Sequence, residues 1–89
     1  MKIIKLDGRF RYYPEFDRAL RYSWTEEQAA RQITAWLYTQ YGAWQELKHD
    51  TEKDTIRTVL NPMWRVDKKK RRIYFKNQAD ISMALLLTG

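Results

Sequence analysis

The chain has 89 residues, which is room for one domain with one modest hydrophobic core. Apolar residues make up 44% of it and aromatic residues 15%, too much for a disordered chain, and it lacks the cysteines that disulfides and cysteine-ligated zinc require. The net charge of +6 favours polyanionic partners such as nucleic acid, anionic lipid or an acidic protein. The longest apolar run, Met83–Leu87, is too short to cross a membrane, and we expect a single cytoplasmic domain over residues 1–89.

The first part of the chain is predicted to form short strands. Lys2–Leu6 is the first, and Asp7-Gly8 after it is a typical two-residue hairpin turn. Arg9–Tyr13 alternates charged and aromatic residues, as expected of a half-exposed strand. Ala19–Trp24 fits another extended segment, although residues 14–21 also fit a helical turn.

The clearest expected element is a helix from Glu26 to Tyr41. Thr25 is a suitable N-cap, and Gln28 three residues later completes a capping box. Gly42 is the expected left-handed stop. An apolar stripe recurs at spacings of three and four residues: Ala29, Ala30, Ile33, Trp36, Leu37 and Tyr41.

The second half is predicted to contain more strands and a final helix. Residues 44–54 are polar and mixed, with room for a short strand before a loop at Lys48–Asp54, and Thr55–Leu60 is rich in β-branched residues. Met63–Asp67 and Arg71–Lys76 fit a hairpin, and Asn77 fits the N-cap of the last helix.

These elements predict an α+β fold, a small antiparallel sheet of about four to five strands with two helices packed on one face. The expected order is β-β-(β)-α-β-β-β-α. Trp36 and Trp64 are the predicted core anchors.

Positive charge is concentrated at both ends of the chain, whereas residues 25–50 are mildly acidic. The strongest cluster is Lys68, Lys69, Lys70, Arg71 and Arg72, at the predicted hairpin tip. Five adjacent cations repel one another, so a polyanion would relieve the repulsion. The alternative is a solvated turn that protects a sheet edge from aggregation.

Arginine and aromatic residues interleave near the N-terminus. Arg9, Arg11, Arg18 and Arg21 fit phosphate contacts, and Tyr12, Tyr13 or Trp24 would stack on unpaired bases if exposed. This combination suits RNA or single strands better than duplex reading. The alternative is that the aromatic residues belong to the core and the arginines extend over it.

The polar stretch 46–54 holds the other candidate chemistry. Glu46 and His49 have a spacing that ligates metal on a helix, and His49 beside Asp50 fits general acid–base catalysis. A solvated loop explains the stretch better, so no catalytic residue, metal or cofactor is expected.

The final helix is apolar on more sides than packing on one sheet requires. Either it is buried on two sides or it supports self-association, and the expected contact of a homodimer is Met83, Leu86 and Leu87.

The segment Arg72-Ile73-Tyr74-Phe75-Lys76-Asn77-Gln78-Ala79-Asp80 joins a strand to an asparagine-capped helix that begins acidic. In a short chain rich in lysine and aromatic residues, it resembles the small early or accessory proteins of T-even-like tailed bacteriophages. Members of that class often bind host nucleic-acid machinery. Some inhibit host defence, including a small basic RNA-binding type that blocks a toxin–antitoxin endoribonuclease.

The expected function is therefore non-enzymatic binding of nucleic acid, with RNA or single strands favoured. The rival hypothesis is a protein-interaction inhibitor that docks on an acidic host enzyme through the same cations.

Overall fold

The computed structural model describes residues 1–6 and 15–89. Within them the chain forms, in order, β1 (Lys2–Lys5), β2 (Arg18–Arg21), the short 3-10 helix η1 (Trp24–Glu26), α1 (Glu27–Tyr41), β3 (Gln45–Asp50), β4 (Thr55–Leu60), β5 (Trp64–Asp67), β6 (Arg72–Phe75) and α2 (Gln78–Thr88). The strand expected over Arg9–Tyr13, with its Asp7-Gly8 turn, lies outside the described residues.

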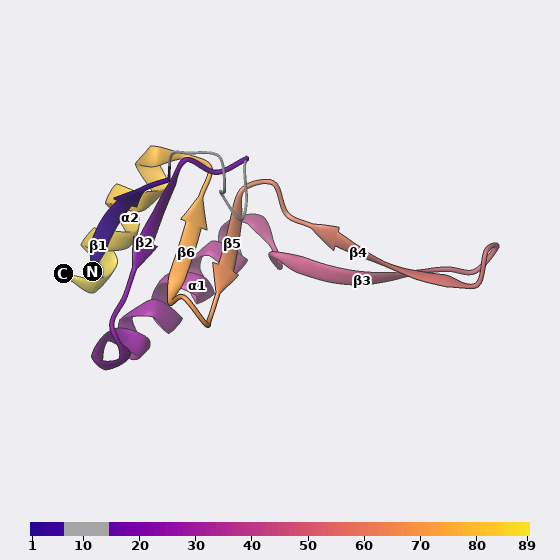
Figure 1. Cartoon of the computed structure of the whole chain (residues 1–89), viewed down its shortest axis with the longest axis horizontal. Helices are drawn as coiled ribbons and strands as arrows, with labels where there is room; N and C mark the ends of the chain where they lie inside the picture. The colour runs from indigo at the N-terminus through magenta and orange to yellow at the C-terminus, as the bar shows by residue number, and fades with distance from the viewer. Residues whose placement is uncertain (7–14) are drawn as a thin grey trace.

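The body is an antiparallel sheet of order β1-β2-β6-β5, with α1 and α2 packed on one face (Figure 1). Alternate residues of the strands, such as Leu20, Ile73 and Phe75, join the helices in the main hydrophobic core. The predicted α+β class is confirmed. Trp64 is a buried anchor as predicted, whereas Trp36 is only half-buried at the edge of the core.

The opposite face of the sheet has a second, smaller apolar cluster of Phe16, Ala19 and Tyr74. Arg65, itself buried, extends this cluster: its guanidinium lies 5.2 Å from the centroid of the Phe16 ring and forms an ion pair with Glu15. Among the described residues, this cluster occupies one half of the face, and the row of charged residues considered below lies on the other half.

β3 and β4 form a separate two-stranded ribbon that projects from the body, which we call the arm (Figure 1). It contributes to a long axis of 47 Å. The predicted small antiparallel sheet corresponds to the four-stranded sheet of the body, and the arm is a second, separate sheet. The prediction of a loop over Lys48–Asp54 is wrong for residues 48–50, which belong to β3. Only residues 51–54 turn, because Leu47 pairs with Thr58 and His49 with Ile56 across the ribbon.

The helix ends confirm two predicted caps and correct one. Gly42 ends α1 with a φ of 82°, and the Asn77 side chain accepts a hydrogen bond from the backbone of α2. The predicted cap at Thr25 is wrong because the turn η1 starts earlier. The capping pair is Ser23 and Glu26, whose Oε1 accepts the Ser23 N–H at 3.0 Å.

α2 meets the body through Asp80, Ile81 and Ala84. Asp80 Oδ2 accepts a hydrogen bond from the Tyr41 hydroxyl at 2.6 Å, which ties the end of α1 to the start of α2. The expected contact residues Met83, Leu86 and Leu87 are exposed on the outer side. Among residues 1–6 and 15–89, no helix is both long and apolar enough to span a membrane.

Candidate nucleic-acid interface

A row of cations crosses the sheet on the face away from the helices. Lys2 of β1 pairs with Arg21 of β2, and Arg21 pairs with Arg72 of β6. Since side chains alternate along a strand, Arg21 shares the face of Ala19, and Arg72 shares the face of Tyr74. The row ends on β5 with Asp67, which is opposite Arg72. Like charges on adjacent strands repel, so this row favours a bound anion.

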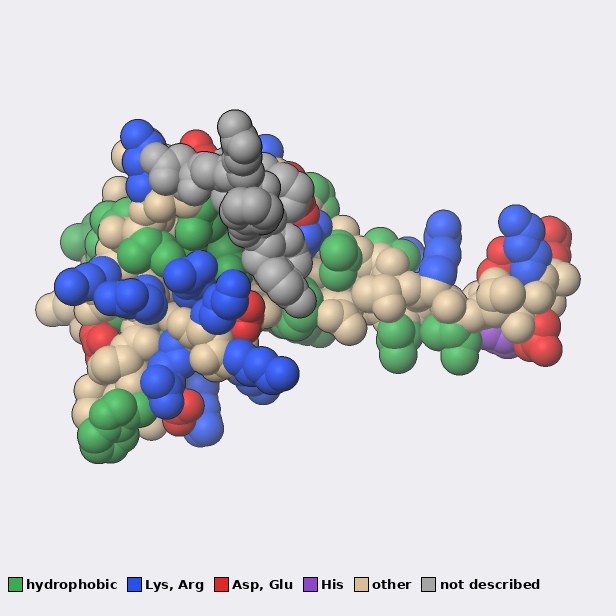
Figure 2. All heavy atoms as spheres, viewed as in Figure 1, with side chains coloured by type: hydrophobic (Ala, Val, Ile, Leu, Met, Phe, Trp, Pro, Cys, Tyr) green, Lys and Arg blue, Asp and Glu red, His purple; other side chains and the backbone are tan. Residues whose placement is uncertain are grey.

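The β5–β6 loop adds its own cations at the same edge of the sheet, and we call the row and this loop together the basic face. Its members are Lys2, Arg21, Lys68, Lys69, Lys70, Arg71 and Arg72. Figure 2 shows lysine and arginine side chains gathered on this part of the body. Within the part of the chain that the structure describes, no ion pair neutralises Lys2, Arg21 or the loop residues Lys68, Lys69 and Arg71.

The basic face surrounds a hollow of about 440 Å³. Four of its lining side chains are cations, Lys2, Arg21, Lys70 and Arg71. The carboxylate in its wall is Glu26, which lies 2.5 Å from the amino group of Met1. The hollow therefore has a net positive lining, as an anion site requires.

Two hydrogen bonds fix the loop beside this hollow. The Lys70 N–H donates to Asp67 Oδ1 at 3.1 Å, and the Tyr22 N–H donates to the Arg71 carbonyl at 3.0 Å. Arg71 adopts a φ of 53°, in the left-handed region. The tight turn therefore holds Lys70 and Arg71 against the end of β2.

Two side chains in the wall of the hollow, Glu26 and Tyr22, have shifted pKa values. Hydrogen bonds from the Met1 amino group and from Ser23 lower the pKa of Glu26 to about 2. Burial and the nearby Glu27 carboxylate raise the pKa of Tyr22 above its usual 10.0. Near neutral pH, Glu26 is therefore a carboxylate that forms an ion pair with the Met1 amino group, and Tyr22 is a neutral hydroxyl.

The structure brings together only part of the predicted site. Lys68, Lys69, Lys70, Arg71, Arg72 and Arg21 belong to the basic face, and Trp24 is 71% exposed in η1, next to Ser23 and Glu26 of the hollow. Arg18 pairs with Lys5 and Phe75 at the other end of the sheet, on the helix side with Leu20. Arg9, Arg11, Tyr12 and Tyr13 lie outside the described residues.

Lys2 is the participant that the sequence reasoning missed. Its parity with Ile4 placed it on a defined face of the first strand. However, the pairing of that strand with β2, which brings it to Arg21, is a tertiary contact that no local pattern indicates.

The carboxylates and the histidine of 46–54 lie at the far end of the arm. Glu46 and His49 are three residues apart on a strand, so they point to opposite faces and cannot share a metal ion. His49 Nε2 lies 3.2 Å from Asp54 Oδ1, and both side chains are exposed. In residues 1–6 and 15–89, no cluster of acidic or histidine side chains could hold a metal ion.

These features define a small α+β protein with a basic sheet face and a projecting two-stranded arm. Comparison of the chain with protein-family models, with curated proteins and with solved structures finds no match.

Proposed function

We infer that this protein binds nucleic acid through its basic face, with RNA or single strands favoured. The observation that carries this proposal is the hollow lined by Lys2, Arg21, Lys70 and Arg71. These residues come from distant parts of the sequence and converge on one site. Each phosphate that such cations neutralise releases condensed counterions, which gives affinity without base reading.

The exposed Trp24 favours an unpaired strand over a duplex. Trp24 directly follows Tyr22 and Ser23, which line the hollow, so we expect a strand held there to reach its exposed indole. Stacking on such a face needs bases that are free of pairing.

The resemblance to small phage proteins supports a biological setting for this activity. In that setting the protein is phage-encoded and acts on host nucleic-acid machinery, or on a host defence system such as a toxin–antitoxin endoribonuclease.

The salt dependence of binding tests the proposal. We expect binding of a fluorescent single-stranded RNA to weaken steeply as salt rises. The triple variant Lys68→Ala, Lys70→Ala, Arg71→Gly should flatten the slope of log K against log salt by about 2, because each lost phosphate contact lowers the steepness of the slope by about 0.7. A matched control, Lys48→Ala, Lys53→Ala, Arg57→Ala, removes the same charge from the arm and should leave the slope unchanged. Equal slopes for the triple variant and the wild type would contradict the proposal.

A second candidate function, docking on a protein, is favoured by the arm. Leu47 and Ile56 are 70% and 69% exposed on one face of the ribbon, together with Leu60. An isolated two-stranded ribbon is only marginally stable in water. A partner protein with a complementary apolar surface would cover this face of the arm.

Self-association through α2 belongs to the same candidate. Met83, Leu86 and Leu87 give its outer side an exposed apolar surface, which supports a homodimer contact. Light scattering after size exclusion, on wild type and on Leu86→Glu, tests this: the variant should be a monomer where the wild type is a dimer. A monomeric wild type at high protein concentration would exclude the homodimer.

A further inference from the structure

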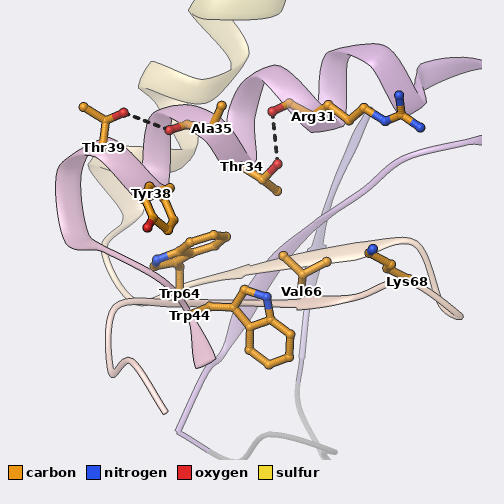
Figure 3. Close-up of a pocket in the computed structure, with 9 residues that line it drawn as sticks. All are labelled: Arg31, Thr34, Ala35, Tyr38, Thr39, Trp44, Trp64, Val66 and Lys68. Carbon is orange, nitrogen blue, oxygen red and sulfur yellow. Dashed lines mark hydrogen bonds between the residues drawn. The ribbon is translucent and has the colours of Figure 1, made fainter. Parts of the chain in front are cut away.

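An aromatic groove lies between α1 and the β5–β6 hairpin, on the helix side of the sheet (Figure 3). It has a volume of about 570 Å³. Tyr38, Trp44, Trp64 and Val66 form its apolar lining. Arg31 and Lys68 project at one end, from α1 and from the hairpin, and Figure 3 shows them on facing walls.

Hydrogen bonds hold the walls of this aromatic groove in place. The Trp64 indole N–H donates to the Gly42 carbonyl at 3.0 Å, so this buried ring forms a fixed floor. The backbone of Trp44 is fixed by the Asn61 N–H, 2.8 Å from its carbonyl oxygen. Tyr38 is 61% exposed, and its ring lines the groove but is not among the residues of the main hydrophobic core.

The threonine hydroxyl groups on the rim of the groove form hydrogen bonds within α1. The Thr34 hydroxyl donates to the Arg31 carbonyl and the Thr39 hydroxyl to the Ala35 carbonyl, each at 3.0 Å. Both hydroxyls thus donate to their own helix, and the lining of the groove is mainly apolar, with the exposed Tyr38, the partly buried Trp44 and the buried Trp64.

The aromatic groove and the basic face are linked by hollows that share lining residues. A smaller hollow of about 260 Å³ shares Arg31, Thr34, Val66 and Lys68 with the groove, and Tyr22 and Glu27 also line it. Tyr22 in turn lines the basic hollow beside Arg71. A chain of hollows therefore leads around the β5–β6 loop from cations to aromatic rings.

We propose that the aromatic groove holds an unpaired nucleobase of a strand whose phosphates lie on the basic face. The proposal rests on the proposed function and extends it to a second site on the helix side. A nucleotide combines a flat aromatic base with an adjacent phosphate. The groove combines aromatic walls with Arg31 and Lys68 at one end, which is the complementary arrangement. A duplex keeps its bases stacked internally and cannot fill the groove.

Three probes of about 12 nucleotides separate the two sites: a single-stranded oligouridylate, an abasic strand with the same phosphates, and an RNA duplex. Tyr38→Ala and Trp44→Ala are each expected to weaken binding of oligouridylate by about 5- to 100-fold. Neither should change the affinity for the abasic strand or the duplex. Tyr38→Phe and Trp44→Phe keep a ring and should bind like the wild type.

Two measurements distinguish a variant that fails to fold from a variant that folds but contradicts the inference. Tyr38 is exposed on a helix, so its replacement tests the groove even if Trp44→Ala is unstable by circular dichroism. Binding of oligouridylate that is as strong for Tyr38→Ala as for the wild type would overturn the inference while leaving the proposed function intact. Equal affinity of the wild type for oligouridylate and the abasic strand would overturn it too. No binding of any probe would overturn the proposed function itself.

Discussion

We predict that the arm can be replaced by a two-residue turn without unfolding the body. Gln45 and Leu60 are the first pair of the ribbon, and the Asn61 N–H donates to the Trp44 carbonyl at 2.8 Å. That hydrogen bond has the pattern that closes a β-turn if two residues stand between Trp44 and Asn61. Replacing Gln45–Leu60 by Asn-Gly therefore preserves the root of the arm.

The expected change in the free energy of unfolding is small and favourable. The arm side chains are mostly exposed, so the body loses little apolar contact with them. Shortening the connection about eightfold lowers the loop-closure entropy cost by up to about 1.8 kcal/mol, from (3/2)RT ln 8.

Urea unfolding monitored by tryptophan fluorescence measures this difference. We expect the shortened protein to be as stable as the wild type or up to about 2 kcal/mol more stable. Its affinity for single-stranded RNA should be unchanged, because none of residues 45–60 lines the basic hollow or the aromatic groove. A loss of more than about 2 kcal/mol would contradict this prediction, because it would show that the arm supports the core.

Three further predictions concern single residues. Asn61→Ala should lower the free energy of unfolding by about 2–3 kcal/mol. The Asn61 side chain donates to two backbone carbonyls at 2.8 and 3.2 Å and accepts a hydrogen bond from a backbone N–H at 2.9 Å, and all three bonds would be lost. A loss below about 0.5 kcal/mol in urea unfolding would contradict this. Glu26→Gln should destabilise the protein near neutral pH, and this loss of stability should shrink as pH falls from about 4.5 to about 2. The pKa of Glu26 is lowered in the folded state, so its contribution to stability is present above the unfolded pKa and is lost on protonation. A loss of stability that is constant with pH in thermal unfolding would contradict this. Arg71→Gly should raise the melting temperature, because glycine relieves up to about 1 kcal/mol of strain in the left-handed backbone conformation of Arg71. The same variant should weaken RNA binding. A lower melting temperature would contradict the expected strain at this position.

Local signals in the sequence were sufficient for several elements. The stripe from Ala30 to Leu37 predicts α1, Gly42 predicts its end, and Asn77 predicts the start of α2. The lysine-rich turn between two apolar strands predicts the β5–β6 hairpin. These features depend on periodicity, capping and turn chemistry, which act between residues close in the chain.

The site depends on contacts that no local pattern contains. Composition and local patterns are enough to predict a basic chain of α+β class with its charge concentrated at Lys68–Arg72. The strand pairing places Lys2 and Arg21 beside that loop and Arg18 away from it, and it makes the polar stretch 46–50 a strand of the arm. Burial across the whole sheet sets the partners and register of the strands, and the alternation of side chains then fixes which cations share a face.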